Sequence, residues 1–482
     1  KMRIWLSFSV VAFVVGCGDG GTGGSEIEVP GDYSFARAGD STVSTTGQIT
    51  RQVLISDLIG LMKTVGAEVL AGDNLDRYDT ADEVFALLNP LYEEGGAADP
   101  NRALPALVGE DNSALQQVYA DLNDKNLQEK LAGNDAVTDH AEWNGGAFVG
   151  WEAANLAVDA DGDLGAPTTP EGLLLAFLYT FSVQTAAAAT GSFPIDAATP
   201  LYLTPEGHDL TQLAQKLLLG GVNFSQGTDD YLDDDVDGKG LLAANELDED
   251  NNYTTLEHHW DEAYGYFGAA RDYGMYTDDE IAAADGREAY RAGYFDSNDD
   301  GLIDLTREYN FSASVNAAKR DRGSTEAAPT DFTGDADLAW RTGRAIIAAA
   351  YDAGEEVDMT ALGAQRDAIV TTWEKALAAT AVHYINDVLG DMDSIGTADY
   401  SFADHAKHWS ELKGFALSFQ FNPRSPMSDS DFAAVHVAVG DAPVGASPTS
   451  PSNDADYRAQ LLEARALIGD AYDFDEANLA SW

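Results

Sequence analysis

Hydrophobic residues recur at helical spacing along most of this chain. In residues 48–70, Val53, Leu54, Leu58 and Leu61 fall on one side of a helix. Similar patterns predict helices over residues 80–92 (broken at Pro90), 112–131, 171–190, 207–224, 253–268, 277–284, 287–295, 338–351, 360–389, 405–419 and 454–472. The alternation of polar and apolar residues that is typical of strands is scarce. We therefore expect an all-α protein, with two helical bundles that share a core and a boundary near residues 240–250.

The segment 253–268, YTTLEHHWDEAYGYFG, is the most distinctive of these helices. Thr254 and Thr255 are candidate N-caps, and His259 and Glu262 lie three residues apart, on one helical face. A second copy of the motif begins at His408. Aligning His259 with His408 also aligns Trp260 with Trp409, Glu262 with Glu411 and Gly265 with Gly414.

A histidine and a carboxylate on one helical face can bind a transition metal, because both are ligands of iron and zinc. The two pairs, His259 with Glu262 and His408 with Glu411, would supply four ligands if the helices converge. The alternative is a buried His–Glu hydrogen bond in an aromatic helix pair, since one pair supplies only two ligands. Both interpretations are compatible with the sequence.

The charge balance of the chain is strongly acidic. It has 82 Asp and Glu against 27 Lys and Arg, a net charge of −55, and a pI near 4.1. Such a charge repels nucleic acids and anionic membrane surfaces, and it favours cations as ligands. We therefore expect no nucleic-acid partner, and we assign most of these carboxylates to a solvated surface.

One acidic loop has the ligand spacing of a calcium site. Carboxylate and amide oxygens at alternate positions, followed by a glycine, form the oxygen cage that a hard cation needs. The candidate ligands are Asp296, Asn298, Asp300, Asp304 and Glu308. The twelfth position, where an EF-hand has its closing glutamate, is Arg307, and Glu308 follows one residue later. The alternative is an acidic turn that holds sodium or water.

Two further segments repeat part of this spacing. The candidate ligands are Asp233, Asp235 and Asp237 in one segment and Asp159, Asp161 and Asp163 in the other. Together the three loops flank the helix at 253–268. Calcium bound there would neutralise neighbouring carboxylates and stiffen the loops, which is a structural role.

The first residues resemble a bacterial lipoprotein signal. Lys1 and Arg3 precede an apolar run, and the single cysteine of the chain, Cys17, follows Val-Val-Gly. This resemblance implies a signal peptide over residues 1–17 and lipid attachment at Cys17, with a glycine-rich tether over 18–31 and a helical domain over 32–482. The lipid bilayer, reached through acylated Cys17, would then be one partner. Gly18, rather than aspartate, after the cysteine favours the outer membrane or cell surface of a Gram-negative bacterium.

Five segments resemble the DUF4856 family of bacterial lipoproteins: residues 47–58, 213–226, 253–273, 341–351 and 408–423. The helical, HxxE-bearing character is also similar to the imelysin-like proteins, which are duplicated helical bundles associated with iron acquisition and carry GxHxxE. Glu257 and Ala406 stand here where that motif has glycine. The resemblance implies an imelysin-like all-α fold, with iron binding as the expected activity.

These observations lead to one main hypothesis and two alternatives. The main hypothesis is a non-catalytic lipoprotein that binds iron, zinc or a metal complex beside a metal-uptake receptor, with calcium stabilising its loops. The first alternative is a metal-dependent peptidase or hydrolase, although HExxH is absent and no serine or cysteine nucleophile can be identified. The second alternative is a structural or adhesive surface protein that binds only calcium.

Overall fold

A computed structural model of the protein describes residues 27–109, 111–135, 148–152, 156, 168–193 and 199–482. Within these residues the regular structure is predominantly helical, with one two-stranded sheet, which confirms the predicted all-α class. The α-helices are α1 (Thr46–Ala71), α2 (Ala81–Glu93), α3 (Pro170–Ala189), α4 (Leu210–Leu218), α5 (Thr255–Phe267), α6 (Asp278–Ile281), α7 (Ser312–Gly323), α8 (Phe332–Ala353), α9 (Met359–Ser394), α10 (Phe402–Leu417), α11 (Asp429–Val439), α12 (Ala455–Tyr472) and α13 (Glu476–Ser481).

Shorter elements connect these helices. Strands β1 (Ala36–Arg37) and β2 (Asp40–Ser41) pair antiparallel, with Ala36 opposite Ser41. α4 continues into two π-helical segments, η5 (Leu219–Phe224) and η6 (Gln226–Tyr231). The 3₁₀ turns are η1 (Leu75–Arg77), η2 (Gly95–Ala97), η3 (Tyr119–Asp121), η4 (Gln128–Lys130), η7 (Gly240–Leu242), η8 (Tyr273–Met275) and η9 (Ser418–Phe421).

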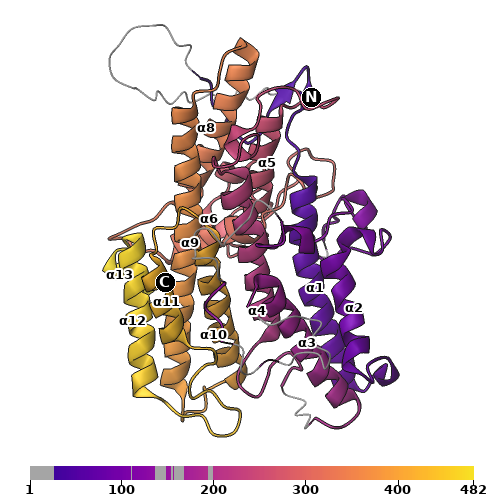
Figure 1. The fold of residues 1–482 in the computed structure, drawn as a ribbon, viewed down its shortest axis with the longest axis vertical. Helices are drawn as coiled ribbons and strands as arrows, with labels where there is room; N and C mark the ends of the chain where they lie inside the picture. The colour runs from indigo at the N-terminus through magenta and orange to yellow at the C-terminus, as the bar shows by residue number, and fades with distance from the viewer. Residues whose placement is uncertain (1–26, 110, 136–147, 153–155, 157–167, 194–198) are drawn as a thin grey trace.

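The long helix α9 packs against α7, α8, α10 and α12, and α12 and α13 lie outside it at one edge of the molecule (Figure 1). On the opposite side α1, α2 and α3 pack together, and α4 and α5 lie between the two groups (Figure 1). A single hydrophobic cluster runs from Tyr33 to Trp482 and includes residues from both groups. The predicted boundary at 240–250 falls at η7 and the turn before α5, and both sides of it contribute to this one core.

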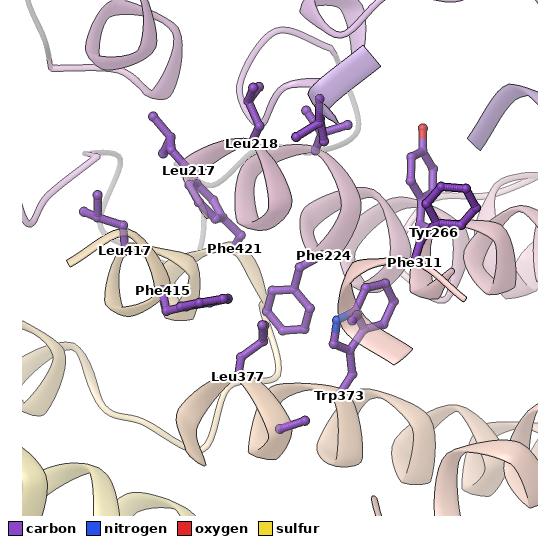
Figure 2. Packing of buried hydrophobic residues seen from close by; sticks show 14 of the residues in the cluster. Leu217, Leu218, Phe224, Tyr266, Phe311, Trp373, Leu377, Phe415, Leu417 and Phe421 are labelled. Atoms are coloured by element: carbon purple, nitrogen blue, oxygen red, sulfur yellow. The ribbon is translucent and has the colours of Figure 1, made fainter. Parts of the chain in front are cut away.

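The centre of the core is aromatic. Figure 2 shows Phe224 of η5 between residues of α9 and residues at the end of α10. Phe224 and Phe267 each meet the indole of Trp373 edge to face, with ring centroids 5.4 and 5.3 Å apart. Gly227 makes the contact with η6 possible, because a Cβ there would lie 2.6 Å from the Trp373 ring. The π-helical turns thus bring η5 and η6 against α9.

Helix α3 is apolar on all sides. It is the one helix among the described residues that is long and apolar enough to cross a membrane, and 78% of that apolar window is buried inside the protein. Its N-cap, Thr169, accepts a hydrogen bond from the amide of Gly172. The helix therefore serves as a core element here, and its bounds are close to the predicted range of 171–190.

Three sequence predictions were wrong. Residues 112–131 form turns with the short η3 and η4 instead of a helix, because the carboxylate of Asp121 binds the amides of Gln117 and Val118 and competes with helical hydrogen bonds. Residues 287–295 form turns pinned by Arg287, which binds Glu280 through its backbone and side chain. α2 continues through Pro90 to Glu93.

Three helices, α7, α11 and α13, were not predicted. α7 was missed because its buried face combines small residues such as Ala317 and Ala318 with the charged Arg320 and Asp321, which gives a weak hydrophobic pattern.

Candidate functional site

The first copy of the repeated motif joins α5 to α1 and α8. Thr254, one of the two candidate N-caps, caps the helix and forms a capping box with Glu257. Trp260 donates its indole N–H to the backbone oxygen of Trp340, 3.0 Å away. Glu262 accepts a hydrogen bond from the Gln48 amide at 2.8 Å. A Cβ on Gly265 would lie 2.8 Å from the Gln48 Cβ, so glycine is needed for this close approach.

The second copy joins α10 to α4 and α11 in the same way. Trp409 donates its indole N–H to the backbone oxygen of Val439 at 3.2 Å. Glu411 lies 3.5 Å from the ammonium group of Lys216 in α4. A Cβ on Gly414 would lie only 2.5 Å from the Lys216 Cβ.

The two copies therefore follow one packing plan. In each copy the tryptophan binds a backbone carbonyl of a neighbouring segment. The glutamate and the glycine three residues later enclose one long polar side chain of an adjacent helix. The repeat that the sequence shows is explained by how these helices pack.

The two histidines have different partners, and each partner lies outside the motif. His259 donates from Nδ1 to the carbonyl oxygen of Gly240 at 3.2 Å and meets the Tyr231 ring edge-on. His408 donates from Nδ1 to Oδ2 of Asp391 at 2.8 Å. Burial lowers the pKa of His259; in His408 burial acts the same way, but the bond to Asp391 outweighs it and raises the pKa.

The structure does not bring the four predicted metal ligands together. α5 packs against α1, α8 and η6, whereas α10 packs against α4 and α9. Across the part of the chain that the structure describes, no three His, Cys, Asp or Glu side chains are grouped so as to hold one metal ion. The expected convergence of His259 and Glu262 with His408 and Glu411 is therefore absent, and transition-metal binding stays a prediction.

The second copy nevertheless lies in a cluster of metal-ligand residue types on α9 and α10. His383, Asp387 and Asp391 follow one another at intervals of four residues and share a face of α9. His383 Nε2 lies 3.3 Å from Oδ2 of Asp387, and His408 binds Asp391 from α10. These four side chains are 16–34% exposed, so solvent and ions reach them. Burial together with the charges of Arg320 and His408 lowers the pKa of His383 to about 3, so its imidazole is neutral.

The HxxxDxxxD pattern formed by His383, Asp387 and Asp391 was not predicted from the sequence as a candidate site. Its helical spacing was visible, but the sequence did not show that α10 would lie across it. Burial raises the pKa of Asp387, and the charge of His408 lowers it in part.

A buried ion cluster occupies the start of α5. Arg344 of α8 has no exposed surface, and it donates to Glu257 at 2.7 Å and to Asp261 at 2.9 Å. Tyr33 donates to Asp261 at 2.7 Å, and Arg37 pairs with Glu257 at 3.0 Å. Burial raises the pKa of Asp261, although Arg344 and Tyr33 counteract it. Two of the segments with family resemblance, 253–273 and 341–351, therefore meet at a structural ion network.

The loop at 296–308 folds as a compact turn. Asp296 accepts hydrogen bonds from the amides of Asp300 and Gly301, and Asn298 accepts one from Asp300. Glu308, with 1% of its surface exposed, accepts from the amides of Ser297 and Asp304 and so joins the two ends of the loop. The carboxylate of Asp304 instead accepts hydrogen bonds from Gln116, which lies outside the loop, and from Thr306 within it. Asp296 and Asn298 thus share the amide of Asp300, while Glu308 binds amides at both ends of the loop.

The segment at 233–237 has arginine partners. Asp233 and Asp234 both pair with Arg424, and Asp234 also pairs with Arg366 at 3.4 Å. Burial and a hydrogen bond with Asp235 raise the pKa of Asp233 to about 6 against the pull of Arg424. Asp237 is exposed. Calcium binding by Asp233, Asp235 and Asp237 stays a prediction. A calcium ion there would have to replace Arg424, which already forms an ion pair with Asp233.

Some of the predicted residues lie outside the described part of the chain. These are Asp159, Asp161 and Asp163, Cys17, the signal peptide over 1–17, and most of the tether.

Comparison with known proteins gives one match. The family model described as "Domain of unknown function (DUF4856)" matches residues 180–437, which confirms the family resemblance. No curated protein and no solved structure matches the chain. The matched region includes both copies of the repeated motif and the loop at 296–308.

Proposed function

The chain belongs to the DUF4856 family, and from that premise we propose that it is a non-catalytic metal-binding protein of the bacterial cell envelope. It is held to the outer membrane or cell surface by lipid on Cys17 and passes iron, zinc or a metal complex to an uptake receptor. Calcium in the loop at 296–308 stabilises it. Its strongly acidic surface attracts cations from the surrounding medium.

The metal site of this proposal lies between α9 and α10. The observation that carries it is the pairing of His408 with Asp391 beside His383 and Asp387. Imidazole and carboxylate ligands suit zinc and iron, and inward-facing His and acid residues on bundle helices are an established way to build such sites. The side chains must turn from their present partners to share an ion.

Several features favour this cluster over the first motif. The Glu262 carboxylate accepts a hydrogen bond from Gln48, and His258 is the one further histidine of the described residues that pairs with it, at 3.9 Å. At α10, two histidines and two aspartates lie on facing helices and are partly exposed. His408 must lose its proton to bind a metal, so we expect affinity to increase with pH through its raised pKa.

The decisive experiment is metal binding by the purified full chain. Isothermal titration with Zn²⁺ and Fe²⁺ would be compared among wild type, His408→Ala, Asp391→Asn and His259→Ala. We expect the first two variants to lose most of the affinity and His259→Ala, the matched change in the other motif, to keep it.

Other outcomes would contradict the proposal in distinct ways. A loss confined to His259→Ala would move the site to α5. Metal binding that none of these variants weakens would show that neither motif contributes to the metal site. No transition-metal binding, together with melting that depends on calcium, would favour the structural or adhesive scaffold. Peptide hydrolysis lost on Glu411→Gln would favour the metal-dependent hydrolase. Release from the membrane fraction on Cys17→Ser tests the anchor separately.

A further inference from the structure

Two adjoining cavities lie along one face of α9. The larger, about 660 Å³, opens between α9 and the start of α8, and the smaller, about 190 Å³, continues towards residues 422–426. Asp367 and Thr371 line both, so the cavities form one groove, here called the α9 groove. The larger cavity falls within the size range of small-molecule sites.

The inner end of the α9 groove is lined by a fully buried carboxylate, Glu374. It accepts hydrogen bonds from Ser425 at 2.5 Å, from Tyr472 at 2.7 Å and from the amide of Asn422. All three donors are neutral, and burial raises the pKa of Glu374 to about 7. A buried carboxylate without a counter-charge is unfavourable, and a cation placed beside it would relieve that cost.

Further carboxylates line the outer part of the groove. Asp331 and Asp335 lie one helical turn apart at the start of α8, and burial together with the charge of Asp331 raises the pKa of Asp335. Two basic residues also line the groove, but Arg424 is already engaged by Asp233 and Asp234. Lys375 is the other basic residue of the lining, and Arg366, which lies beside the groove, pairs with Asp367 at 2.6 Å. Asp331, Asp335 and Glu374 are the groove carboxylates for which no ion pair is seen among the described residues.

We propose that the α9 groove binds a small linear organic cation of the polyamine type. Asp367 and Glu374 are seven residues apart on α9, a distance of about 10 Å along the helix. A compact ion would reach only one of these carboxylates. A chain of ammonium groups separated by methylenes reaches several, and its apolar segments pack on Phe332 and Pro329. This site is separate from the α9–α10 metal cluster, and neither proposal depends on the other.

The test is titration of the full chain with spermidine at physiological ionic strength. Asp335→Asn and Glu374→Gln remove one groove carboxylate each. Asp470→Asn, at an exposed position of α12, makes the same charge change elsewhere. We expect the two groove variants to bind at least roughly tenfold more weakly, as for a lost charged hydrogen bond, and Asp470→Asn to bind like wild type.

Non-specific attraction to an acidic protein gives a different result. In that case Asp470→Asn weakens binding as much as Asp335→Asn, and Mg²⁺ displaces spermidine as readily as putrescine does. Either observation, or no spermidine binding at all, would overturn the proposal. Because Asp335 is exposed, the variant Asp335→Asn should fold. If Glu374→Gln does not fold, the comparison of Asp335→Asn with Asp470→Asn alone decides the question.

Discussion

At the scale of single residues, the buried charges have very different surroundings. Arg344 is enclosed by Glu257 and Asp261, so each charge in the cluster has a partner at hydrogen-bond distance. Glu374 is equally buried but has only neutral donors. These differences in local charge compensation lead to separate predictions for stability.

Replacing Arg344 with methionine should destabilise the protein strongly. The change leaves Asp261 buried without a cation, which typically costs about 3–5 kcal/mol of unfolding free energy. The control is Arg322→Met, because Arg322 and its partner Asp279 are 38% and 52% exposed and such pairs contribute at most about 1 kcal/mol. Urea unfolding followed by tryptophan fluorescence measures both. Equal losses in the two variants would show that the buried cluster contributes no more than a surface pair.

Glu374 should make the stability of the protein depend on pH. Its pKa is about 7 in the folded state against an ordinary 4.5, so the folded protein binds this proton more tightly than the unfolded chain does. The resulting stabilisation is present below pH 4.5 and is lost as the pH rises to about 7. The shift corresponds to about 3 kcal/mol.

The variant Glu374→Gln imitates the protonated side chain and should remove this part of the pH dependence. Denaturation midpoints measured from acidic to neutral pH would test it, with Asp470→Asn as the control. If Glu374→Gln and wild type lose stability in parallel over this interval, the carboxyl group does not titrate there.

At the scale of helices, glycines decide how closely elements approach. Gly343 of α8 faces the indole of Trp260 on α5, and a Cβ at this position would lie 2.0 Å from the ring. The same principle operates in both copies of the repeated motif, where Gly265 and Gly414 receive side chains of α1 and α4. Helix contacts of this kind cannot accept even one added methyl group without movement.

The variant Gly343→Ala should therefore lose stability despite the better helix propensity of alanine. Overpacking of a filled core costs about 1–3 kcal/mol. In α9, Gly363 has only the Arg366 guanidinium near its would-be Cβ, at 3.9 Å, so Gly363→Ala should gain about 0.5–1 kcal/mol. Thermal melting of the two variants tests the sign of each effect. A stabilised Gly343→Ala would mean that Trp260 can move aside.

At the scale of the whole molecule, one continuous core joins the helices on both sides of residues 240–250, and a charge of −55 surrounds it. Self-repulsion of such a surface favours the unfolded chain, and bound cations oppose it. The compact turn at 296–308 lies beside residues 112–116, so an ion there would stabilise a contact between distant parts of the chain.

Calcium should raise the melting temperature through this loop. Saturation at one hundred times the dissociation constant contributes about 2.7 kcal/mol. Asp296→Asn should abolish the increase. Asp299→Asn removes the same charge from a residue of the loop outside the predicted ligand set, and it should keep the increase. Equal responses of the two variants to calcium and EGTA would indicate general charge screening.

The sequence alone predicted much of the secondary structure, because helical spacing and capping are local properties. α1, α3, α5, α9 and α12 lie close to their predicted ranges, and Thr254 caps α5 as expected. The prediction failed where side chains bind the nearby backbone, as Asp121 does, or where small residues weaken the hydrophobic pattern, as in α7.

The tertiary structure alone decided which motifs meet. The presence of one motif on two separate helices does not show whether the two copies meet or which other helices pack against each of them. Only packing placed Gln48 and Lys216 against the two copies and Asp391 against His408. Likewise, the α9 groove combines α8, α9 and residues 422–426, which are distant in sequence. The sequence determined the helices because their hydrogen bonds are local, whereas the sites depend on contacts that exist only after those helices pack.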